Sequence, residues 1–467
     1  MNAIATIAVL GGGPAGVTAA IGLARLGYAV ILLTTPRRFA ALEGVSDRVA
    51  EGLKNAGLTT ALATLAPPSP RRVRWNGMDS AANHERLIYR PDFDAALLDD
   101  AVRQGVETLA AQVKTWTTEA AKVRIDYLQN GKAEHLYADF VVEARGRAAP
   151  HRIPPAARGT ESISLLQYWQ PTDSRARQKT YVAHSAVQSF ADGWAWLAQN
   201  QDGRRYLQLT LDVASANLPA KVDLGEFCRV RLQSLEIARE FTAGATPVGI
   251  PCARPCTPIL AGDLLGERYL KIGDAAVAGD PLSGNGIFLA LSSALQAPAI
   301  IRTLLSAPER APLAREFHQQ RLTGLFYRFA RVGRDFYAGE SGWRELPFWQ
   351  SRRRWPDSEP LHPPVTPNDV TIATRPVLDH HSIIAAEVVV TPDQTLGVWR
   401  LDDKELAPAL KLIQTTRTRD AALRLLIEHL AYSPPRAAEL IEWMRRQGWI
   451  DFEQSNNEAI RKRQAIA

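Results

Sequence analysis

Hydrophobic residues near the N-terminus predict a strand, a helix and a second strand. Ile7–Leu10 is a wholly apolar run of strand length, and the small residues of Val17–Leu26 read as a helix that ends before Gly27. A second apolar run of strand length follows at Tyr28–Leu33. Strands that alternate with a helix indicate parallel pairing, so we expect the chain to begin as an α/β fold with a parallel sheet.

The pattern changes twice further along the chain. Residues 40–66 carry apolar positions at helical spacing and end at Pro67–Pro70, whereas residues 160–260 consist mainly of strand-like runs. Helical patterns return after residue 261 and continue to about Phe336. The other predicted elements are strands in Arg71–Tyr89, a helix opened by Arg90–Asp94, a hairpin turning at Asn130-Gly131, strands at Ser162–Trp169, Lys179–Ser189, Gly193–Asn200 and Arg204–Val213, an interrupted helix at Leu224–Phe241, and a long helix at Gly286–Leu305.

These changes predict three domains in an α/β chain. A Rossmann-like domain would comprise residues 1–160 and 261–340, with a β-sheet substrate domain, residues 161–260, inserted into it. Residues 341–370 contain many Pro, Trp and Arg residues, and we expect them to form a linker arm. In residues 371–467 two strand-like runs precede three helical patterns, which predicts a small C-terminal α+β domain, winged-helix-like.

Composition narrows the class of protein only slightly. The 467 residues are 46% hydrophobic, with a net charge of +6 and a pI near 9.2, which suits acidic ligands and does not by itself indicate nucleic acid. The cysteines Cys228, Cys252 and Cys256 cannot make a disulfide framework, and no histidine near the last two completes a metal site. No basic leader precedes the first strand, and no apolar stretch reaches about 18 residues. We therefore expect a cytoplasmic protein without a metal, bound to neither membranes nor nucleic acid.

The first turn carries the glycine pattern of a dinucleotide site. Gly11, Gly13 and Gly16 are spaced as GxGxxG, with Pro14 and Ala15 between the last two. Gly11 permits the tight turn, Gly13 lets the backbone approach a pyrophosphate, and Gly16 allows the helix to pack closely on the strand. Free N–H groups at the start of the helix attract the anion. We expect these five residues to form the cofactor site.

The acidic residue that usually binds the ribose at the end of the second strand is absent. Thr34 stands in its place, and Arg37 and Arg38 follow shortly afterwards. The Thr34 hydroxyl or these arginines would therefore have to hold the adenosine end of the ligand.

Four segments together resemble a known superfamily over residues 4–330. They are the glycine turn, the Arg90-x-x-Phe93-Asp94 segment, the strand end Val141–Gly146, and Ile272–Ala276 followed by Asp280–Gly286. In this order they resemble the FAD-dependent aromatic monooxygenases and the flavin-dependent tryptophan halogenases. The resemblance implies that Asp274 binds the ribityl chain of FAD and that Arg90 lies close to its phosphate and ribityl side.

The resemblance also implies that the loop Pro281–Gly286 lies against the isoalloxazine ring. Reduced flavin carries negative charge near N1 and O2. The backbone N–H groups of Gly284, Asn285 and Gly286, at the start of a helix, would stabilise that charge. The alternative is an ordinary glycine loop.

Candidate substrate residues lie on the predicted strands of the inserted domain. Gly193-Trp-Ala-Trp196 resembles the family's GWxWxIP signature, although Leu197 and Ala198 replace Ile and Pro, and this strand lies near the tunnel behind the flavin in the family. We therefore place Trp194, Trp196 and His184 in the substrate pocket, with a purely structural role for the tryptophans as the alternative. The catalytic base stays unassigned. His184 and Glu43 are candidates, although residues of this kind are more often structural or solvated than catalytic.

Two departures from the superfamily bear on the reaction. Halogenases carry an essential lysine before the Arg-x-x-Phe-Asp motif, but this chain has no lysine between Lys54 and Lys114, which favours oxygen insertion over halogenation. The second Asp-Gly signature, which phenol hydroxylases use for FAD and NADPH, is unclear here. We therefore expect NAD(P)H to supply electrons either directly or through a reductase.

Within this superfamily, the length of the chain and its extra C-terminal domain most resemble those of the LodB-like flavoproteins. This branch includes the monooxygenase of quinohemoprotein amine dehydrogenase maturation. The resemblance implies hydroxylation of a tryptophan side chain in a protein substrate, alone or in complex with its upstream modifying enzyme, on the way to a tryptophylquinone. Alternatives are a small-molecule aromatic hydroxylase or halogenase, and a non-catalytic flavin-binding partner. We expect the C-terminal domain, with the arm Trp343–Trp355, to hold the protein substrate, against the alternative that it only packs on the core.

Overall fold

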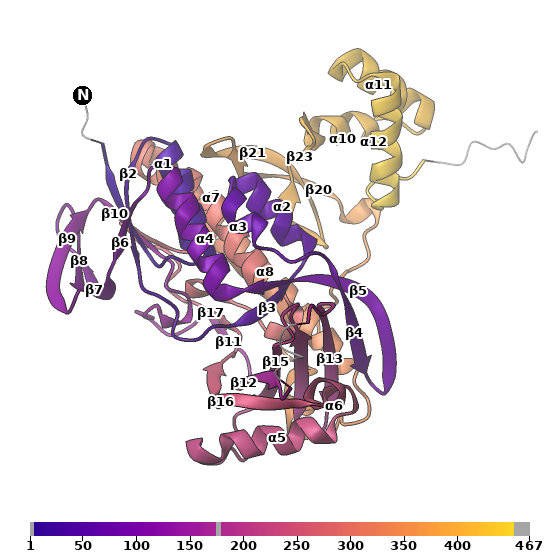
Figure 1. The fold of residues 1–467 in the computed structure, drawn as a ribbon. Helices are drawn as coiled ribbons and strands as arrows, with labels where there is room; N and C mark the ends of the chain where they lie inside the picture. Colours follow the sequence, from indigo (N-terminus) through magenta and orange to yellow (C-terminus); the bar gives the residue numbers. More distant parts are fainter. Residues whose placement is uncertain (1–3, 174–178, 453–467) are drawn as a thin grey trace, which may run out of the picture. The chain divides into compact units, whose positions relative to one another are not determined.

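The computed structural model describes residues 4–173 and 179–452 (Figure 1). Contacts within the chain divide it into two compact units, of which the first comprises Met1–Arg302 and Leu325–Ser358 and the second Thr303–Gly324 and Glu359–Ala467. The long helix α8 (Ala311–Ala338) therefore begins in the second unit and ends in the first. We had expected residues 303–324 in the Rossmann-like domain, but they cluster with the C-terminal residues instead.

A five-stranded parallel sheet organises the first unit, in the order β18-β10-β1-β2-β6. Its central strand is the first apolar run, in which all residues from Ile7 to Leu10 are fully buried. A parallel sheet is usually covered on both faces, so its strands are expected to be continuous apolar runs. The strand bounds are β1 Thr6–Leu10, β2 Ala29–Thr34, β6 Glu107–Ala110, β10 Phe140–Glu143 and β18 Tyr269–Lys271.

Helices and a small sheet complete this layer. The helices are α1 (Pro14–Arg25), α2 (Asp47–Ala56), α3 (Thr59–Ala63), α4 (Arg90–Arg103) and α7 (Gly286–Ser306) (Figure 1). Between β6 and β10 the chain makes an antiparallel sheet of β7 (Gln112–Thr118), β8 (Val123–Gln129) and β9 (Lys132–Ala138). Its predicted turn at Asn130-Gly131 is confirmed, with φ of 50° and 80° at the two residues. Short strands β11 (Ala157–Arg158), β17 (Ile259–Leu260) and β19 (Val277–Ala278) form a further sheet.

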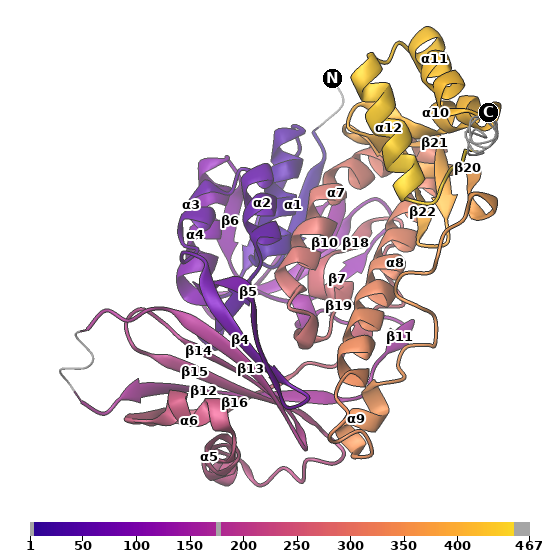
Figure 2. The ribbon, with the colours of Figure 1, turned by 90° about the vertical axis from the view of Figure 1, so that its right-hand side faces the viewer.

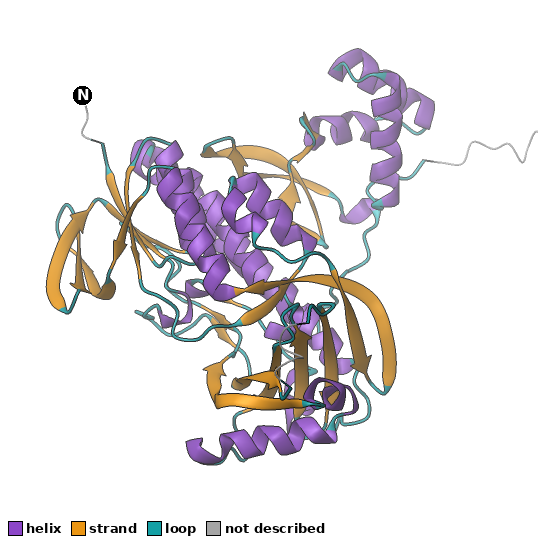
Figure 3. Ribbon diagram, viewed as in Figure 1, coloured by secondary structure: helices purple, strands orange, loops and turns teal. Residues whose placement is uncertain are grey.

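A larger sheet of eight strands, β16-β12-β15-β14-β13-β4-β5-β3, forms the other layer of the first unit (Figures 2 and 3). The four strands predicted between residues 160 and 213 are confirmed with shifted ends. They are β12 (Ser162–Pro171), β13 (His184–Phe190), β14 (Gly193–Gln199) and β15 (Arg205–Asp212). Part of the predicted Lys179–Ser189 strand precedes β13 as loop.

Residues far from 161–260 also belong to this sheet. Three strands from the N-terminal part continue it, namely β3 (Leu42–Val45), β4 (Ser69–Trp75) and β5 (Met78–Tyr89). The prediction of helix from residue 40 was therefore wrong for β3, although helices α2 and α3 follow. The edge strand β16 (Ala245–Pro255) was missed because its prolines are atypical of strands, yet an edge strand tolerates them.

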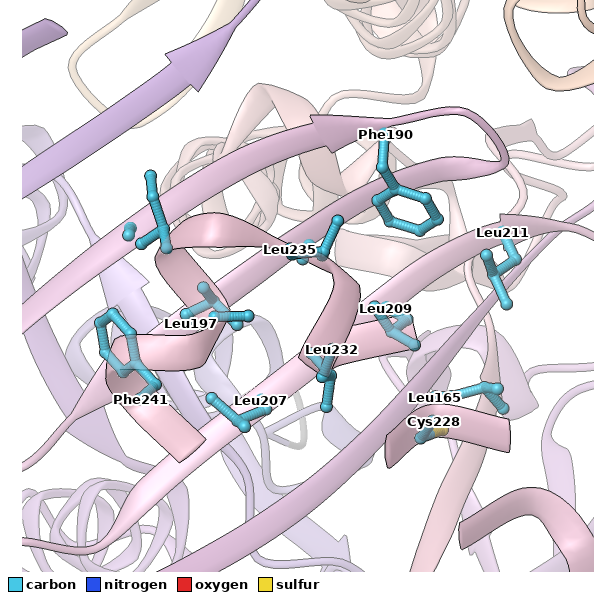
Figure 4. Packing of buried hydrophobic residues seen from close by; sticks show 14 of the residues in the cluster. Leu165, Phe190, Leu197, Leu207, Leu209, Leu211, Cys228, Leu232, Leu235 and Phe241 are labelled. Carbon is cyan, nitrogen blue, oxygen red and sulfur yellow. The ribbon is translucent and has the colours of Figure 1, made fainter. Parts of the chain in front are cut away.

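The two faces of the large sheet bury different sets of residues. One face packs against helices α5 (Leu224–Ser234) and α6 (Glu236–Thr242), the interrupted helix of the prediction, through Leu197, Leu207, Leu232 and Phe241 (Figure 4). The other face carries a cluster rich in aromatic residues, and we call it the aromatic face. Its buried members are Leu42, Leu87, Leu166, Ala183, Val187, Trp194, Trp196, Ala198, Tyr206, Tyr337, Phe348 and Trp349.

The segment expected as a linker arm is in large part a piece of the first unit. Residues up to Ser358 cluster with that unit, and Pro347–Arg352 forms helix α9. Trp349 is 0% exposed and donates its indole N–H to the carbonyls of Phe190 and Ala191, at 3.1 and 3.0 Å. Its side chain is therefore core, and it is not available to grip a protein substrate.

The second unit has its own core. Strands β20 (Thr371–Asp379), β21 (Ser382–Thr391) and β22 (Gln394–Val398) form an antiparallel sheet, and a short hairpin, β23 (Arg400–Leu401) with β24 (Lys404–Glu405), follows. Helices α10 (Leu406–Gln414), α11 (Arg419–Leu430) and α12 (Pro434–Arg446) bury Leu410, Leu426 and Ile441 against this part. The three predicted helices and the α+β character of the C-terminal region are confirmed.

Candidate flavin site at the carboxyl ends of the parallel strands

The sequence motifs converge on one edge of the parallel sheet. The glycine turn follows β1, Thr34 ends β2, Gly146 lies just after β10 and Asp274 just after β18. Because these strands are parallel, their carboxyl ends meet at one edge, and β1 lies where the strand order reverses direction. Such a switch point is where open α/β sheets bind ligands.

Two glycines of the turn are required by the protein itself. A Cβ atom on Gly11 would lie 2.5 Å from the Ala144 carbonyl oxygen, and φ of Gly11 is 117°. A Cβ atom on Gly16 would lie 1.8 Å from the Gly11 carbonyl oxygen. Both distances are far below van der Waals contact, so the packing of helix α1 against strands β1 and β10 depends on these glycines.

Other glycines at this edge face open space instead. A Cβ atom on Gly13, Gly284 or Gly286 would meet no protein atom within 4 Å. Gly13 has φ of −83°, a value any residue adopts, so neither its backbone nor its neighbours explain the absence of a side chain. A ligand that approaches the backbone closely does explain it, as the pyrophosphate does in dinucleotide folds.

The start of helix α1 leaves its first backbone N–H groups without a side-chain cap. Pro14 stands at the first position of α1, where its missing N–H costs nothing, and Gly13 is the N-cap without a side-chain cap. Ala15 fits against Gly273, since a Cβ atom on Gly273 would lie 2.8 Å from the Ala15 Cβ. Thr34 lies beside the turn, because a Cβ atom on Gly12 would lie 2.2 Å from its hydroxyl oxygen.

Asp274 presents a carboxylate that is ready to accept hydrogen bonds. Its side chain is 38% exposed, and its nearest cation is Arg147, whose Nε lies 3.7 Å from Oδ2. Arg147 is fixed in turn by the carbonyls of Thr257 and Gly279, at 2.5 and 3.2 Å. Among the described residues, no group donates a hydrogen bond to Asp274. Desolvation raises the pKa of the Asp274 carboxyl, an effect that Arg147 opposes.

Arg90 and Arg37 bind carboxylates of the protein itself. Arg90 is 4% exposed and contacts Asp94 at 2.6 Å and Glu43 at 3.1 Å, while Arg37 contacts the other Asp94 oxygen at 2.9 Å. Burial lowers the pKa of Arg90, but Glu43 and Asp94 outweigh it and raise the pKa overall. Both guanidinium groups are therefore bound to carboxylates of the chain, and their role in cofactor binding stays a prediction. Glu43, a candidate base, is an ion-pair partner of Arg90.

The loop after Asp280 has a defined shape. The Asp280 carboxylate accepts the Leu282 N–H at 2.9 Å and so caps the short turn Pro281–Ser283. Gly284 follows with φ of 63°, in the left-handed region, and helix α7 begins at Gly286. Asn285 donates its side-chain amide to the Ser283 carbonyl. The loop thus opens the helix whose first N–H groups we had assigned to the flavin.

The structure does not bring all three predicted substrate residues together. Trp194 and Trp196 lie on the aromatic face, where their indole N–H groups bond the Tyr337 hydroxyl at 3.3 Å and Glu85 at 3.2 Å. His184 lies on the opposite face, with its ring 5.0 Å from that of Phe241 on α6. Side chains alternate along a strand, and His184 shares the parity of Ala186, which faces α5 and α6. His184 is therefore placed away from the two tryptophans.

Two buried polar residues of the aromatic face were missed from the sequence. Glu85 is 7% exposed and accepts the Ser185 hydroxyl as well as Trp196, and Tyr337 bonds Asp280. Neither belongs to a motif. The signal for Glu85 was its inward position on a strand, two residues before buried Leu87, which only the register of β5 reveals.

Comparisons with known proteins agree with this architecture. A family model described as pyridine nucleotide-disulphide oxidoreductase matches residues 5–186. The tryptophan 2-halogenase of Chondromyces crocatus is 23% identical, covering 74% of this chain and 70% of its own. The structure of the flavin-dependent halogenase CmlS has 16% identity and a TM-score of 0.73 over 96% of both chains, which shows a shared fold.

One solved structure is much more similar. The peptidyl tryptophan dihydroxylase QhpG, described as essential for tryptophylquinone cofactor biogenesis, is 46% identical with a TM-score of 0.82, covering 96% of this chain and all of its own. The chain belongs to the QhpG family of flavoproteins. It is therefore a flavin-dependent oxidoreductase, and its cofactor is FAD, reduced by NAD(P)H directly or through a reductase.

The residues of this chain at the edge of the parallel sheet suit the chemistry of FAD, the cofactor of its family. The bare backbone at Gly13 suits the pyrophosphate, the unbonded Asp274 carboxylate suits hydroxyl donors, and Gly284 and Gly286 leave the loop open to a flat ring. Among the described residues, no group of three or more His, Cys, Asp or Glu side chains is arranged to hold a metal ion.

Most of the predicted long helix, up to Arg302, belongs to the first unit. By length and composition α7 (Gly286–Ser306) could cross a membrane, but 67% of its most apolar window is buried in the chain. That burial is typical of the core helix of a soluble protein, which agrees with the enzymes this chain resembles.

Proposed function

We propose that this protein hydroxylates the side chain of a tryptophan in a protein substrate, on the way to a tryptophylquinone cofactor. The observation that carries the proposal is the likeness to QhpG, at 46% identity over nearly the whole of both chains. The likeness to QhpG spans 96% of this chain, whereas the tryptophan 2-halogenase match covers 74% of it.

The chain's own residues prepare the site for this reaction. FAD, when bound and reduced, supplies the activation of O₂ for transfer of oxygen to an aromatic ring. Asp274 and the glycine turn would hold the cofactor, and the loop Pro281–Gly286 would present backbone N–H groups where negative charge develops. The aromatic face shields the interior from water with Trp194, Trp196 and Tyr206, each under 10% exposed. No described residue is assigned as the base that removes the ring proton.

The absence of a lysine in the relevant segment disfavours the halogenase alternative. The chain has no lysine between Lys54 and Lys114, where the halogenases to which it is distantly related carry the essential residue. Arg71 and Arg72 lie on β4 in this stretch, but both contact carboxylates, Glu85 at 3.8 Å and Asp79 at 3.3 Å. A guanidinium keeps its proton, so it cannot replace the lysine amine as a nucleophile.

Mass spectrometry tests the proposed function. The tryptophan-containing substrate of QhpG is incubated with the FAD-loaded protein, NAD(P)H, a reductase and air. One or two added oxygen atoms on the tryptophan support the proposal. Unmodified substrate together with oxidation of a free aromatic compound would favour the small-molecule alternative, and bound flavin without any oxidation would favour a non-catalytic partner.

We further propose that the second unit holds the protein substrate or the enzyme that modifies it beforehand. A separate docking site would raise the local concentration of the target tryptophan. Truncation near residue 365 is a poor test, because the Ile383 N–H bonds the Thr303 hydroxyl at 2.8 Å and residues 303–324 would lose their partner sheet. Hydrogen exchange of the intact protein with and without QhpG's substrate is cleaner. Protection of α10, α11 or α12 supports docking there, and protection confined to the first unit contradicts it.

A further inference from the structure

A chain of hydrogen bonds joins the aromatic face to the loop at the start of α7. Trp194 on β14 donates its indole N–H to the Tyr337 hydroxyl oxygen at 3.3 Å. The Tyr337 hydroxyl lies 3.1 Å from both oxygens of Asp280, so it donates to this carboxylate. Asp280 in turn accepts the Leu282 N–H at 2.9 Å. Three separate elements, β14, α8 and the loop, are thus connected through Tyr337.

We propose that Tyr337 and Asp280 form a positioning pair that sets the shape of the loop Pro281–Gly286 for the flavin and ties it to the aromatic face through Trp194. The proposal rests on the family's use of FAD and does not depend on which aromatic substrate is hydroxylated.

The loop has little other support on its open side. Cβ atoms on Gly284 and Gly286 would meet no protein atom within 4 Å, so no side chain packs on the loop at these positions. It is held from the protein side by Asp280, through the Leu282 N–H and through the Ser283 hydroxyl, which bonds the Asp280 carbonyl at 2.8 Å. The Asp280 carboxylate therefore fixes the Leu282 N–H, while backbone bonds from Ser283 to Asp280 and from Gly284 to Pro281, at 3.1 and 3.0 Å, close the rest of the turn.

Tyr337 is itself rigidly placed. It is 2% exposed and makes edge contacts with Phe348 and Trp349 of α9, with ring centroids 5.7 and 6.0 Å apart. Burial raises the pKa of Tyr337 well above its ordinary value, so the hydroxyl keeps its proton and remains a donor. Burial also raises the pKa of Asp280, an effect that its hydrogen bonds and Arg352 oppose. The tyrosine thus offers Asp280 a fixed donor throughout the neutral pH range.

The test removes one hydroxyl and keeps the ring. In Tyr337→Phe the aromatic contacts survive, and the small cavity lined by Asp280, Ser162 and Arg352 can admit water to the carboxylate, so the protein should fold. We expect its dissociation constant for FAD to rise about tenfold and the midpoint potential of the bound flavin to shift. Tyr127→Phe is the matched control, because that hydroxyl bonds Glu134 in the separate β7–β9 sheet, 3.3 Å away.

A second variant tests the connection to the aromatic face. Trp194→Phe removes the indole N–H and should weaken FAD binding less than Tyr337→Phe does. The double variant should be no weaker than Tyr337→Phe alone, because the chain is already broken at its centre. Additive losses would overturn the connection. FAD affinity within twofold of wild type and an unchanged potential in Tyr337→Phe would overturn the positioning role. Both readouts are made without substrate, so they stand even if the proposed hydroxylation fails.

Discussion

Asp274 allows a prediction in which cofactor affinity and protein stability move in opposite directions. Its carboxylate has two oxygens and accepts no hydrogen bond from the described residues, with Arg147 at 3.7 Å as its nearest cation. We assume that each oxygen accepts one hydrogen bond from a hydroxyl of the FAD ribityl chain, at about 1.5 kcal/mol for a charged acceptor. Asp274→Ala then loses about 3 kcal/mol of the binding free energy of FAD. That is roughly a 150-fold increase in the dissociation constant of FAD. Asp274→Asn keeps one acceptor and should lose less.

Asp274→Asn should not lower the free energy of unfolding of the protein without FAD. Because the pKa of Asp274 is raised in the folded state, the folded chain binds the proton more tightly than the unfolded chain does. The free energy of unfolding is therefore highest below the unfolded pKa, near 3.9, and it falls as pH rises above that value. At pH 7 the ionised Asp274 carboxylate destabilises the folded apoprotein. Asp274→Asn removes this destabilisation. The apoprotein variant should therefore be at least as stable as wild type at pH 7, and this difference should shrink toward pH 4.

Two measurements check this prediction. FAD affinity is obtained by titrating the apoprotein, and stability by urea unfolding of the apoprotein at pH 7 and at about pH 4. Asp139→Asn is the control, because Asp139 binds Lys122 at 2.7 Å and the Thr6 N–H at 2.8 Å, which lower its pKa against the effect of burial. That variant should lose stability at pH 7 and keep its affinity for FAD. An Asp274→Asn apoprotein that unfolds more easily while binding FAD normally would refute the reasoning.

The remaining predictions concern the core, the aromatic face and the reaction. Trp349→Ala should destabilise the first unit by about 3–5 kcal/mol, measured by denaturant unfolding, because the side chain is fully buried; a change below about 1 kcal/mol would mean that α9 is peripheral. Tyr168→Phe should raise the melting temperature, because the buried Tyr168 hydroxyl has no partner among the described residues; a fall would reveal one. His184→Ala should retain hydroxylation, since His184 lies on the far face of the sheet, and lost turnover with intact FAD binding would contradict this. Bromide or chloride with reductant should yield no halogenated tryptophan by mass spectrometry, and useful rates of bromination would show that a lysine is dispensable.

Local sequence was sufficient wherever one segment carries its own signal. The strand Ile7–Leu10, the glycine turn and helix α1 follow from a continuous apolar run and from backbone needs at Gly11 and Gly16, all within about twenty residues. The three C-terminal helices likewise follow from apolar spacing, with Pro434 at the start of α12 and Gly448 just past its end at φ of 73°.

Tertiary structure decided what depends on pairing between distant segments. Strands β3, β4 and β5 join a sheet whose other strands begin more than seventy residues later, and no local pattern encodes that register. The ion pair of Arg90 with Glu43 depends on the pairing of β3 with β5. The face on which His184 lies and the burial of Trp349 likewise depend on contacts between segments far apart in the sequence. The connection from Trp194 through Tyr337 to Asp280 joins residues up to 143 positions apart. Sequence alone specified the chemistry of the flavin site, because that chemistry resides in short motifs, and only the packed chain fixed the partners of each side chain around it.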